Sequence, residues 1–478
     1  MILSGNFHKK GLDINDIMEI AQKEAAVQID FKVINVWGQL YHMTMPAELL
    51  TNKLCENGIG FDGSSVGGYA FDPAFSDCRM KPDITTAFID PFFEIKTISF
   101  LCDVVMAENP QQIHPLCPRS ISRKAEKYLS DCFPNTKSKW GPELEFFLLD
   151  DVRYDIDKNS CFYVIDSKEA CWNRGVNLNP NFGNTIKYQK GYSIAPPFDQ
   201  IVQIRSQMAK MAQDLGIGIK VHHHEVASPG QCELELDFDI LPFSADKVTV
   251  LKYIIRNEAI RNKMTSTFMP KPLANENGSG LHLHQHFFQD NKPLFYDEQG
   301  AFFKMSKWAM SYIAGILIHA PALMAFTNPS TNSFKRLLPG FEAPTNITFS
   351  LGDRTAAIRI PKYATDPKDK RIEYRPPDAT ANIYYAMAAI QLAGLDGVKK
   401  DLDPVKMGFS IDKKKKNKQL PASLNEALDI LKKEHGFLTD SGVFTEELIE
   451  VWIDQKRKEI EELNKLPHPY EFIQYYNC

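Results

Sequence analysis

Carboxylates and histidines recur at alternate positions in two short segments of the chain. The segment GPELEFFLLD carries Glu143 and Glu145, and the segment HLHQH carries His282, His284 and His286. Successive side chains of a β-strand point to opposite faces, so residues two apart share a face. If these segments are strands, each presents a row of polar side chains on one face. Such rows have the chemistry to bind metal ions or to transfer protons.

Two further segments repeat the pattern. In RIEYR the shared face would carry Arg371, Glu373 and Arg375, and in VHHHEVASPGQCELEL a Ser-Pro-Gly turn between Glu225 and Glu233 could return the chain to the same neighbourhood. One row alone is typical of a half-solvated strand. Four rows that mix carboxylate, imidazole and guanidinium favour a site instead. Carboxylates that converge in a cleft repel one another and need bound cations, because unpaired buried charge is costly.

The types of these ligands indicate the metal and the reaction. Oxygen-rich ligand sets with one imidazole favour Mg²⁺ or Mn²⁺ over zinc. A cationic cluster follows, made of Arg336, Arg354, Arg359, Lys368, Arg371 and Arg375. Forked guanidinium donors bind phosphate and carboxylate oxygens, so metals with arginines predict phosphoryl transfer. Neither standard phosphate-binding loop is present, but Asn277–Gly280 (NGSG), just before the histidine row, allows close backbone approach to a ligand.

Composition excludes several other classes of protein. The chain has 478 residues and a formal net charge of −5, so it lacks the strongly basic character of nucleic-acid binding proteins. Nine cysteines without a C-x-x-C pair predict reduced thiols and a cytoplasmic location. The N-terminal residues do not have the layout of a signal peptide. The apolar stretch Met310–Phe326 is interrupted by Ser311, His319 and Pro321, and we expect a buried helix there rather than a membrane span.

The elements that must position these residues fall into two predicted domains. Residues 1–110 read as a small α+β domain, with a helix from Asp13 onward and strands in FKVINVWGQ and TISFLCDVVMA. Residues 111–478 read as a large domain of intermixed strands and helices. The long helices predicted there are Ala245–Phe268, Phe303–Phe326, Ala379–Val398 and Glu446–Asn464. The lysine tract Lys413–Lys418 is predicted to be a solvated loop.

The motifs, taken together, resemble those of bacterial type I glutamine synthetases over essentially the whole chain. The resemblance rests on FDGSSVGGY, GPELEFF, HHHEVASPGQCE, NGSGLHLH, RLLPGFEAP, DRTAAIRIP and KRIEYRPPD, which occur in the family's order and approximate spacing. It implies an α+β fold, with a small β-grasp-like N-terminal domain and a large domain built on a partial antiparallel barrel flanked by helices. It also implies ATP-dependent ligation of ammonia to the γ-carboxylate of glutamate, through γ-glutamyl phosphate.

The resemblance further implies two Mg²⁺ or Mn²⁺ ions at each active site. One ion would be held by Glu145, Glu225 and Glu233, and the other by Glu143, His282 and Glu373. Glutamate and its developing γ-phosphate would meet Asn277, Gly278, Arg336, Glu342, Arg359 and Arg375. The transferring phosphate would meet Arg354 and Lys368, and the ATP would lie along Phe238, His284 and Arg371. Of these, Arg354, Arg359 and Glu342 are expected to act in catalysis.

The ammonium pocket implied by the resemblance combines two subunits. Asp62 would reach into a neighbouring subunit's site and take a proton from ammonium, with Ser65 and Tyr192 completing the pocket. The expected assembly is a homododecamer of two stacked six-membered rings, with neither nucleic acid nor membrane as a partner.

The chain departs from the family pattern at a few positions. Lys220 stands where many relatives have an acidic residue, which puts a nucleotide-ribose contact there in doubt, and His286 stands where a small residue is common. Covalently regulated relatives carry a tyrosine that receives AMP, but the matching stretch FSIDKKKKNKQLPASL has none. The segment Asp150–Gly175 nevertheless resembles an insertion of that regulated (beta-like) subgroup. We therefore expect a chain of this subgroup that is not adenylylated.

Three alternatives remain at this point. A ligase of the same fold could use a polyamine in place of ammonia, although Asp62, Ser65, Tyr192 and Glu342 are all present. A non-enzymatic relative would be expected to lose metal ligands, and none of the six is missing. A zinc hydrolase built on His222–His224 is disfavoured, because adjacent histidines on a strand cannot all face one metal.

Overall fold

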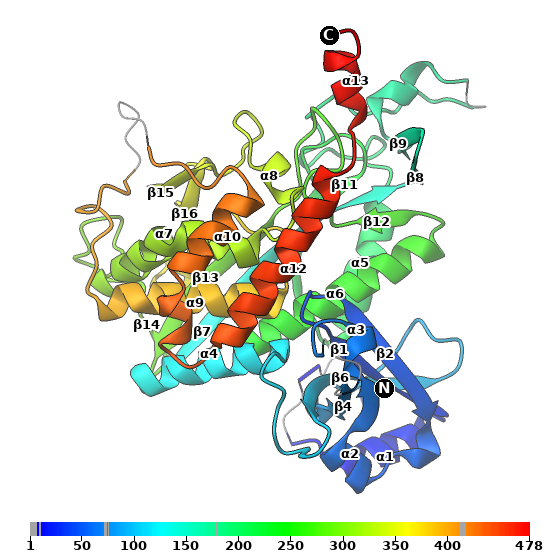
Figure 1. Cartoon of the computed structure of the whole chain (residues 1–478), viewed down its shortest axis with the longest axis vertical. Helices are drawn as coiled ribbons and strands as arrows, with labels where there is room; N and C mark the ends of the chain where they lie inside the picture. Colours follow the sequence, from blue (N-terminus) through cyan, green and yellow to red (C-terminus); the bar gives the residue numbers. More distant parts are fainter. Residues whose placement is uncertain (1–6, 9–10, 71–73, 75, 178–179, 411–416) are drawn as a thin grey trace.

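The computed structural model describes residues 7–8, 11–70, 74, 76–177, 180–410 and 417–478, so most of the tract Lys413–Lys418 lies outside the described residues. Within the described part, the N-terminal region folds around a six-stranded sheet of order β2-β1-β6-β4-β3, with β5 paired to β6. The strands are β1 Gln28–Ile34, β2 Leu40–Pro46, β3 Ile59–Asp62, β4 Asp77–Pro82, β5 Phe88–Ile89 and β6 Thr97–Met106. The helices are α1 Ile14–Lys23, α2 Asn52–Asn57 and α3 Gly63–Val66. In Figure 1 this region is the blue end of the molecule.

The predicted first helix is confirmed, and its start has a local cause. Asp13 accepts hydrogen bonds from the backbone N–H groups of Asn15 and Asp16, while Asp16 accepts from the N–H of Asp13. This reciprocal capping satisfies donors that have no partner within the helix. The helix then buries Ile17 and Ile20. Strand β6 matches the predicted segment Thr97–Ala107 within one residue.

Among the described residues, the large sheet has nine strands and runs β10-β11-β7-β13-β17-β16-β15, with β12 paired to β7 and β14 to β13. Its pairs are antiparallel except β15 with β16. The strands are β7 Thr136–Leu149, β10 Ile219–His224, β11 Gln231–Leu236, β12 Thr265–Thr267, β13 Leu281–Gln289, β14 Lys292–Pro293, β15 Asn346–Leu351, β16 Ala356–Ile360 and β17 Ile372–Tyr374. The predicted fold class, a small α+β region followed by a curled antiparallel sheet with helices, is confirmed.

Long helices pack against the strands of the large sheet and against one another (Figure 1). They are α4 Pro118–Cys132, α5 Val202–Leu215, α6 Leu241–Arg261, α7 Lys307–Thr327, α9 Ile383–Lys399, α10 Leu424–Lys433 and α12 Glu446–Asn464. Short helices α8 Ser333–Arg336, α11 Gly436–Thr439 and α13 Pro469–Tyr475 lie between and after them. Helices α7 and α9 touch backbone to backbone: a Cβ at Gly315 would lie 2.2 Å from the carbonyl oxygen of Ala393. Only glycine permits that approach.

Three predicted helices have different ends in the structure. The helix expected at Ala245–Phe268 begins at Leu241, with Pro242 in its first turn, and ends at Arg261. Lys263 has a φ of 57°, a left-handed conformation that a helix cannot continue through, and strand β12 follows. Positive φ at Phe303 and Lys304 likewise delays α7 until Ser306 caps it, and α9 begins at Ile383 rather than Ala379. The prediction Glu446–Asn464 is confirmed at both ends.

Helix α7 has the length and apolar composition of a membrane span, alone among the helices of the described residues. Four fifths of its most apolar window, 78%, is nevertheless buried inside the protein. The prediction of a buried helix over Met310–Phe326 is therefore confirmed. Helices of this kind form the cores of large globular domains.

Two elements stand away from the body of the chain. The hairpin of β8 (Asp151–Asp157) and β9 (Ser160–Asp166) forms a separate two-stranded sheet, and its side chains are largely exposed. The C-terminal helix α13 projects at the end opposite the small sheet, near the hairpin in Figure 1. Every residue from 461 to 478 is exposed, including Phe472, Tyr475 and Tyr476.

Candidate active site

A polar cleft of about 820 Å³ opens on the inner face of the large sheet. All six residues predicted as metal ligands line it: Glu143, Glu145, Glu225, Glu233, His282 and Glu373. The pairing of the strands explains this convergence. Glu143 lies opposite His282 on β13, and Glu145 lies opposite Glu233 on β11. The polar rows of four strands therefore meet on one surface.

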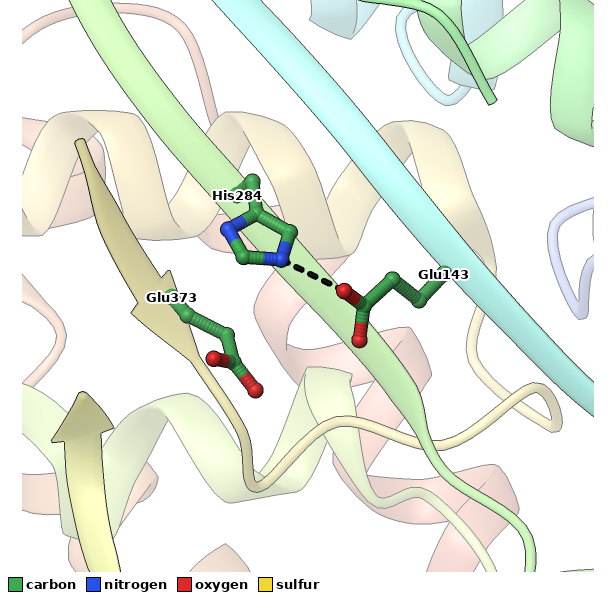
Figure 2. Close-up of side chains that lie close together, drawn as sticks. All are labelled: Glu143, His284 and Glu373. Carbon is green, nitrogen blue, oxygen red and sulfur yellow. Dashed lines mark hydrogen bonds and ion pairs between the residues drawn. The ribbon is translucent and has the colours of Figure 1, made fainter. Parts of the chain in front are cut away.

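One cluster of ligand atoms lies where β7, β13 and β17 run side by side. Figure 2 shows Glu143, His284 and Glu373 turned toward one another, each from a different strand. His284 Nε2 lies 2.6 Å from one oxygen of Glu143, and His282 Nδ1 lies 3.0 Å from the other. Burial opposes ionisation of Glu143, but the two histidines hold its pKa well below the usual range. Glu143 is thus a partly buried carboxylate held in its charged form.

A second cluster lies on β10 and β11. His223 Nε2 is 3.2 Å from Glu233, and His223 Nδ1 is 3.7 Å from Glu225. Burial, with the charge of Glu145, raises the pKa of Glu225 to about 8. Burial and the neighbouring Glu143 and Glu225 raise the pKa of Glu233 well above its usual value. Carboxylates that resist ionisation together in one pocket fit a bound cation, which would supply the missing positive charge.

Glu145 lies between the two clusters. One of its oxygens accepts a hydrogen bond of 2.8 Å from the N–H of Gly280, and the other lies 3.6 Å from His282 Nε2. Ligand atoms of Glu143, Glu233 and His282 also lie within 4.8 Å of one another. The lining residues supply carboxylate oxygens and imidazole nitrogens but no thiolate. This donor set fits Mg²⁺ or Mn²⁺, so the residues match the ions that the sequence implies.

Three arginines surround this anionic centre. Arg359 and Arg375 both donate to the carboxylate of Glu373. Burial alone would raise the pKa of Glu373, but nearby cationic groups, with Arg375 the strongest, lower it to about 2. Arg336 is buried and donates to the carbonyl oxygens of Pro376 at 2.7 Å and Pro377 at 3.2 Å. These backbone contacts fix the guanidinium beside His282 at the cleft wall.

The other residues predicted to bind glutamate or ammonium divide between two places. Tyr192, Asn277, Gly278, Arg336, Glu342, Arg354, Arg359 and Arg375 all line the cleft. Position 278 has room only for glycine, because a Cβ there would lie 2.3 Å from the carbonyl oxygen of Pro270. Glu342 is exposed and has a φ of 55°, in the loop between α8, which ends at Arg336, and β15, which begins at Asn346. This geometry suits a loop over the mouth of the cleft.

Asp62 and Ser65 lie elsewhere, on the small N-terminal sheet. Among the described residues, those that line the cleft all come from position 143 onward. Asp62 caps α3, is exposed, and accepts hydrogen bonds from the hydroxyl groups of Ser64 at 2.7 Å and Ser65 at 2.6 Å. These hydrogen bonds, with that of Ser65 the largest, lower the pKa of Asp62. Within one chain, the predicted proton acceptor and the metal cluster are therefore not brought together.

The residues predicted along ATP form a patch beside the cleft rather than its lining. Arg371 Nε donates to His284 Nδ1 at 3.3 Å, and its guanidinium lies 5.9 Å from the centre of the Phe238 ring. A Cβ at Gly141 would meet that ring at 2.8 Å, so the glycine makes room for Phe238. Lys368 is exposed on the 3₁₀ turn Pro367–Asp369.

Sequence reasoning missed two residues here. His223 joins the second cluster, and the spacing rule that paired Glu143 with Glu145 would have found it, because His223 and Glu225 are also two apart. Tyr363 also lines the cleft. The guanidinium groups of Arg359 and Arg371 lie 5.8 and 5.2 Å from the centre of its ring. A lone tyrosine in a loop gives no such signal.

The two unusual residues of the sequence have neighbours in the structure. Lys220 forms an ion pair with Glu235, which lines the cleft, so a carboxylate is present on the adjacent strand. His286 lies between the rings of Phe238 and Phe288, 4.7 and 5.0 Å away. Burial, foremost, lowers the pKa of His286 to about 4.

An open antiparallel half-barrel with carboxylate–imidazole clusters and surrounding arginines defines a class of enzyme: one that transfers phosphoryl groups with the help of divalent cations. Comparison with known proteins narrows this class. Residues 26–107 match the glutamine synthetase β-grasp domain, and residues 115–475 match the glutamine synthetase catalytic domain.

The chain is similar to whole glutamine synthetases as well. It is 42% identical to that of Aquifex aeolicus over 471 residues, covering 97% of this chain and 98% of the relative. It is also 42% identical to that of Nostoc sp. strain PCC 7120 over 475 residues, covering 97% and 99%. The solved structure of Plasmodium falciparum glutamine synthetase matches with a TM-score of 0.89 at 28% identity, covering 97% of this chain and 99% of that one. The chain belongs to the glutamine synthetase family.

Proposed function

We propose that the cleft is the place where ATP phosphorylates glutamate and where ammonia then displaces the phosphate. The chain is an ATP-dependent glutamate–ammonia ligase, because it belongs to its family along nearly its whole length. The observation that carries the site assignment is the convergence of all six predicted metal ligands on one cleft. Two Mg²⁺ or Mn²⁺ ions are proposed, one at Glu145, Glu225 and Glu233 and one at Glu143, His282 and Glu373.

In the first step a γ-carboxylate oxygen of glutamate attacks the γ-phosphorus of ATP, the bond to ADP breaks, and γ-glutamyl phosphate forms. Bound divalent ions would neutralise phosphate and carboxylate charge as it develops. Arg336 and Arg359 orient the carboxylate, while Arg354 and Lys368 stabilise the transferring phosphate. Asn277 and Gly278 hold the α-amino end of glutamate. Phe238, His284 and Arg371 hold the nucleotide beside the cleft, and Arg375 supports Glu373.

In the second step ammonia attacks the acyl carbon and phosphate leaves. Ammonium must first lose a proton, and we assign this proton transfer to Asp62 of a neighbouring copy, with Ser65 and Tyr192 at the pocket. The hydrogen bonds from Ser64 and Ser65 keep Asp62 ionised, so it attracts a cation. Glu342, on the loop over the cleft, contributes a second carboxylate and excludes water.

This assignment requires an assembly, and two exposed features support one. Asp62 lies outside the cleft of its own chain, and the aromatic residues of α13 are uncovered. Apolar surface of this kind is typical of interfaces between copies. We propose a homododecamer, with each chain divided into domains 1–110 and 111–478. All nine cysteines are free thiols, which supports a cytoplasmic location.

Turnover measurements test the reaction directly. Glutamine formation coupled to ATP hydrolysis should require glutamate, ammonium and either Mg²⁺ or Mn²⁺. Because a polyamine ligase of the same fold is the alternative, putrescine is the discriminating amine. Equal rates with putrescine and ammonium would overturn the substrate assignment, and turnover after complete removal of divalent metal would overturn the metal assignment.

A further inference from the structure

A second cavity lies at the junction of the two sheets, away from the cleft. It has a volume of about 180 Å³ and is lined by β1 and β2 of the small sheet, by α6, and by the segment 379–383 that leads into α9. We call it the junction cavity. Its apolar lining includes Ile34, Leu40 and Val248, and its polar lining includes Lys252, Arg256 and Asn382. A cavity of roughly 150 Å³ holds a molecule of six heavy atoms such as benzene.

The positive charges of the junction cavity are only partly balanced. Lys32 is paired with Asp30 at 2.6 Å and with Asp90 at 3.0 Å. In contrast, neither Lys252 nor Arg256 lies within 4.0 Å of a carboxylate oxygen of any described residue. Both face the ring of Phe268, at 5.1 and 5.2 Å.

The two cations act on each other. Burial, followed by the charge of Arg256, lowers the pKa of Lys252 to about 7. The carboxylate of Asp378 favours the charged form of Lys252, but it lies beyond ion-pair distance. Asp378 instead accepts hydrogen bonds from Thr380 and Asn328. Like charges held together without a counter-charge attract an anion, which would stabilise both at once.

Asn382 adds a second, independent indication. It is fully buried, and its amide group donates to the carbonyl oxygens of Asn35 at 3.3 Å and Val36 at 3.0 Å. These two bonds fix the orientation of the amide. Its side-chain oxygen accepts no hydrogen bond from any described residue. Buried acceptors are rarely left without a donor, so a ligand that carries an O–H or N–H group would satisfy it.

A short stretch of chain links the junction cavity to the active-site cleft, because Arg375 lines the cleft and Ala379 lines the cavity. Lys252 donates to the carbonyl oxygen of Ala379 at 2.7 Å, and Ala379 follows directly after the Pro376–Asp378 segment. The carbonyl oxygens of Pro376 and Pro377 are those that hold Arg336. A ligand that draws Lys252 away from Ala379 therefore acts on the backbone that positions a substrate-binding arginine.

We propose that the junction cavity binds a small organic carboxylate that carries a hydrogen-bond donor, and that this binding is coupled to the glutamate site. The carboxylate lies between Lys252 and Arg256, and the donor meets the side-chain oxygen of Asn382. The coupling, unlike the binding, rests on the proposed role of Arg336. The two parts are therefore tested by different measurements.

Calorimetric titration of the assembled enzyme with L-lactate tests the binding, in the presence of saturating glutamate so that the substrate site is filled. Wild-type enzyme should bind lactate. The substitutions Lys252→Met and Arg256→Gln should each lower the affinity for lactate at least about tenfold, a typical effect of losing a hydrogen bond to a charged group. L-Lactamide, which has the same shape without the charge, should not bind. Lys210→Met, at an exposed lysine paired with Asp214 on α5, is the matched control and should bind normally.

Absence of lactate binding to the wild type, or equal affinity in all three variants, would overturn the site. Arg256 is exposed, so its variant keeps the test valid if Lys252→Met fails to assemble. Bound lactate should also change the KM for glutamate about fivefold or more while kcat stays constant. Unchanged KM with lactate bound would overturn the coupling. Because calorimetry needs no turnover, an inactive enzyme that binds lactate would contradict the proposed reaction and not the cavity.

Discussion

Arg359 lies opposite Glu373 on neighbouring strands, and its guanidinium donates to the Glu373 carboxylate from one side while Arg375 donates from the other. The carboxylate that is proposed to hold a metal thus also serves as the counter-charge of two arginines. Glu145, by contrast, accepts hydrogen bonds from two neutral donors, the backbone N–H of Gly280 at 2.8 Å and the side-chain amide of Gln231 at 3.5 Å. The two ligands should therefore respond differently to loss of charge.

Glu373→Gln and Glu145→Gln should both weaken Mn²⁺ binding by more than about 100-fold and abolish turnover. Only Glu373→Gln should also lower the thermal midpoint of the metal-free enzyme, because it leaves two guanidinium groups without their buried partner. Electron paramagnetic resonance of free Mn²⁺ and calorimetric melting measure the two effects. Equal melting temperatures of the two variants would contradict the dual role of Glu373, and normal Mn²⁺ affinity would contradict the ligand assignment.

Asp62→Asn should impair amide formation far more than formation of γ-glutamyl phosphate, because only the second step needs ammonia without its extra proton. A general base contributes about 10²–10⁴-fold to a rate, so we expect a loss of that order. The measurement is glutamine formation, compared with ATP turnover when hydroxylamine, a nucleophile that needs no deprotonation, replaces ammonium.

The position of Asp62 outside its own cleft gives a second test of the same residue. Chains carrying Asp62→Asn and chains carrying Glu145→Gln, each inactive alone, should regain part of the activity when they assemble together. Mixed assemblies verified by mass that remain inactive would indicate a site completed within one chain.

Lys252 should make the stability of the protein depend on pH. Its pKa is about 7 in the folded protein and about 10.5 when unfolded, so between these values the unfolded chain binds more protons. Burying the charged form of Lys252 therefore destabilises the folded protein. This destabilisation is fully present below about pH 7 and disappears as pH rises toward 10.5. The slope stays below about 1.4 kcal/mol per pH unit, because the side chain is only half-buried. The free energy of unfolding, measured by urea denaturation at several pH values, should show this slope in the wild type and not in Lys252→Met.

The enzyme should not be adenylylated. The stretch Phe409–Leu424 has no tyrosine, and none occurs between Tyr385 and Tyr470. Residues 411–416 of this stretch lie outside the described part of the chain. Intact-mass measurement on protein from nitrogen-replete cells should give the unmodified mass. A gain of one AMP per chain that phosphodiesterase removes would contradict this prediction.

The sequence predicted the cleft better than it predicted the rest of the molecule, for a physical reason. Alternation along single strands is a local property, so the rows at Glu143, His282 and Glu373 could be found without knowing how the strands pair. His223 follows the same rule but was hidden in a run of three histidines. The end of α6 and the start of α7 depend on positive φ angles at Lys263 and Lys304, and a lysine in the sequence does not predict such a conformation.

The junction cavity could not be predicted in the same way. Its walls come from positions as distant as Lys32, Lys252 and Asn382, and only the packing of the small sheet on α6 brings them together. Nor does any one of these residues carry a motif. The balance of charge around Lys252 becomes visible only once its neighbours are known.

The close contact between α7 and α9 has a consequence for synthesis of the chain. About 70 residues separate the end of α7 from the end of α9, which covers it. At ribosomal rates of about 5–20 residues per second, α7 emerges about 4–14 s before its partner is complete. During that interval a helix apolar enough for a membrane has no backbone groove at Gly394 and Gly397 to pack against. A chain truncated before α9 therefore leaves the apolar surface of α7 without the partner that covers it in the folded protein.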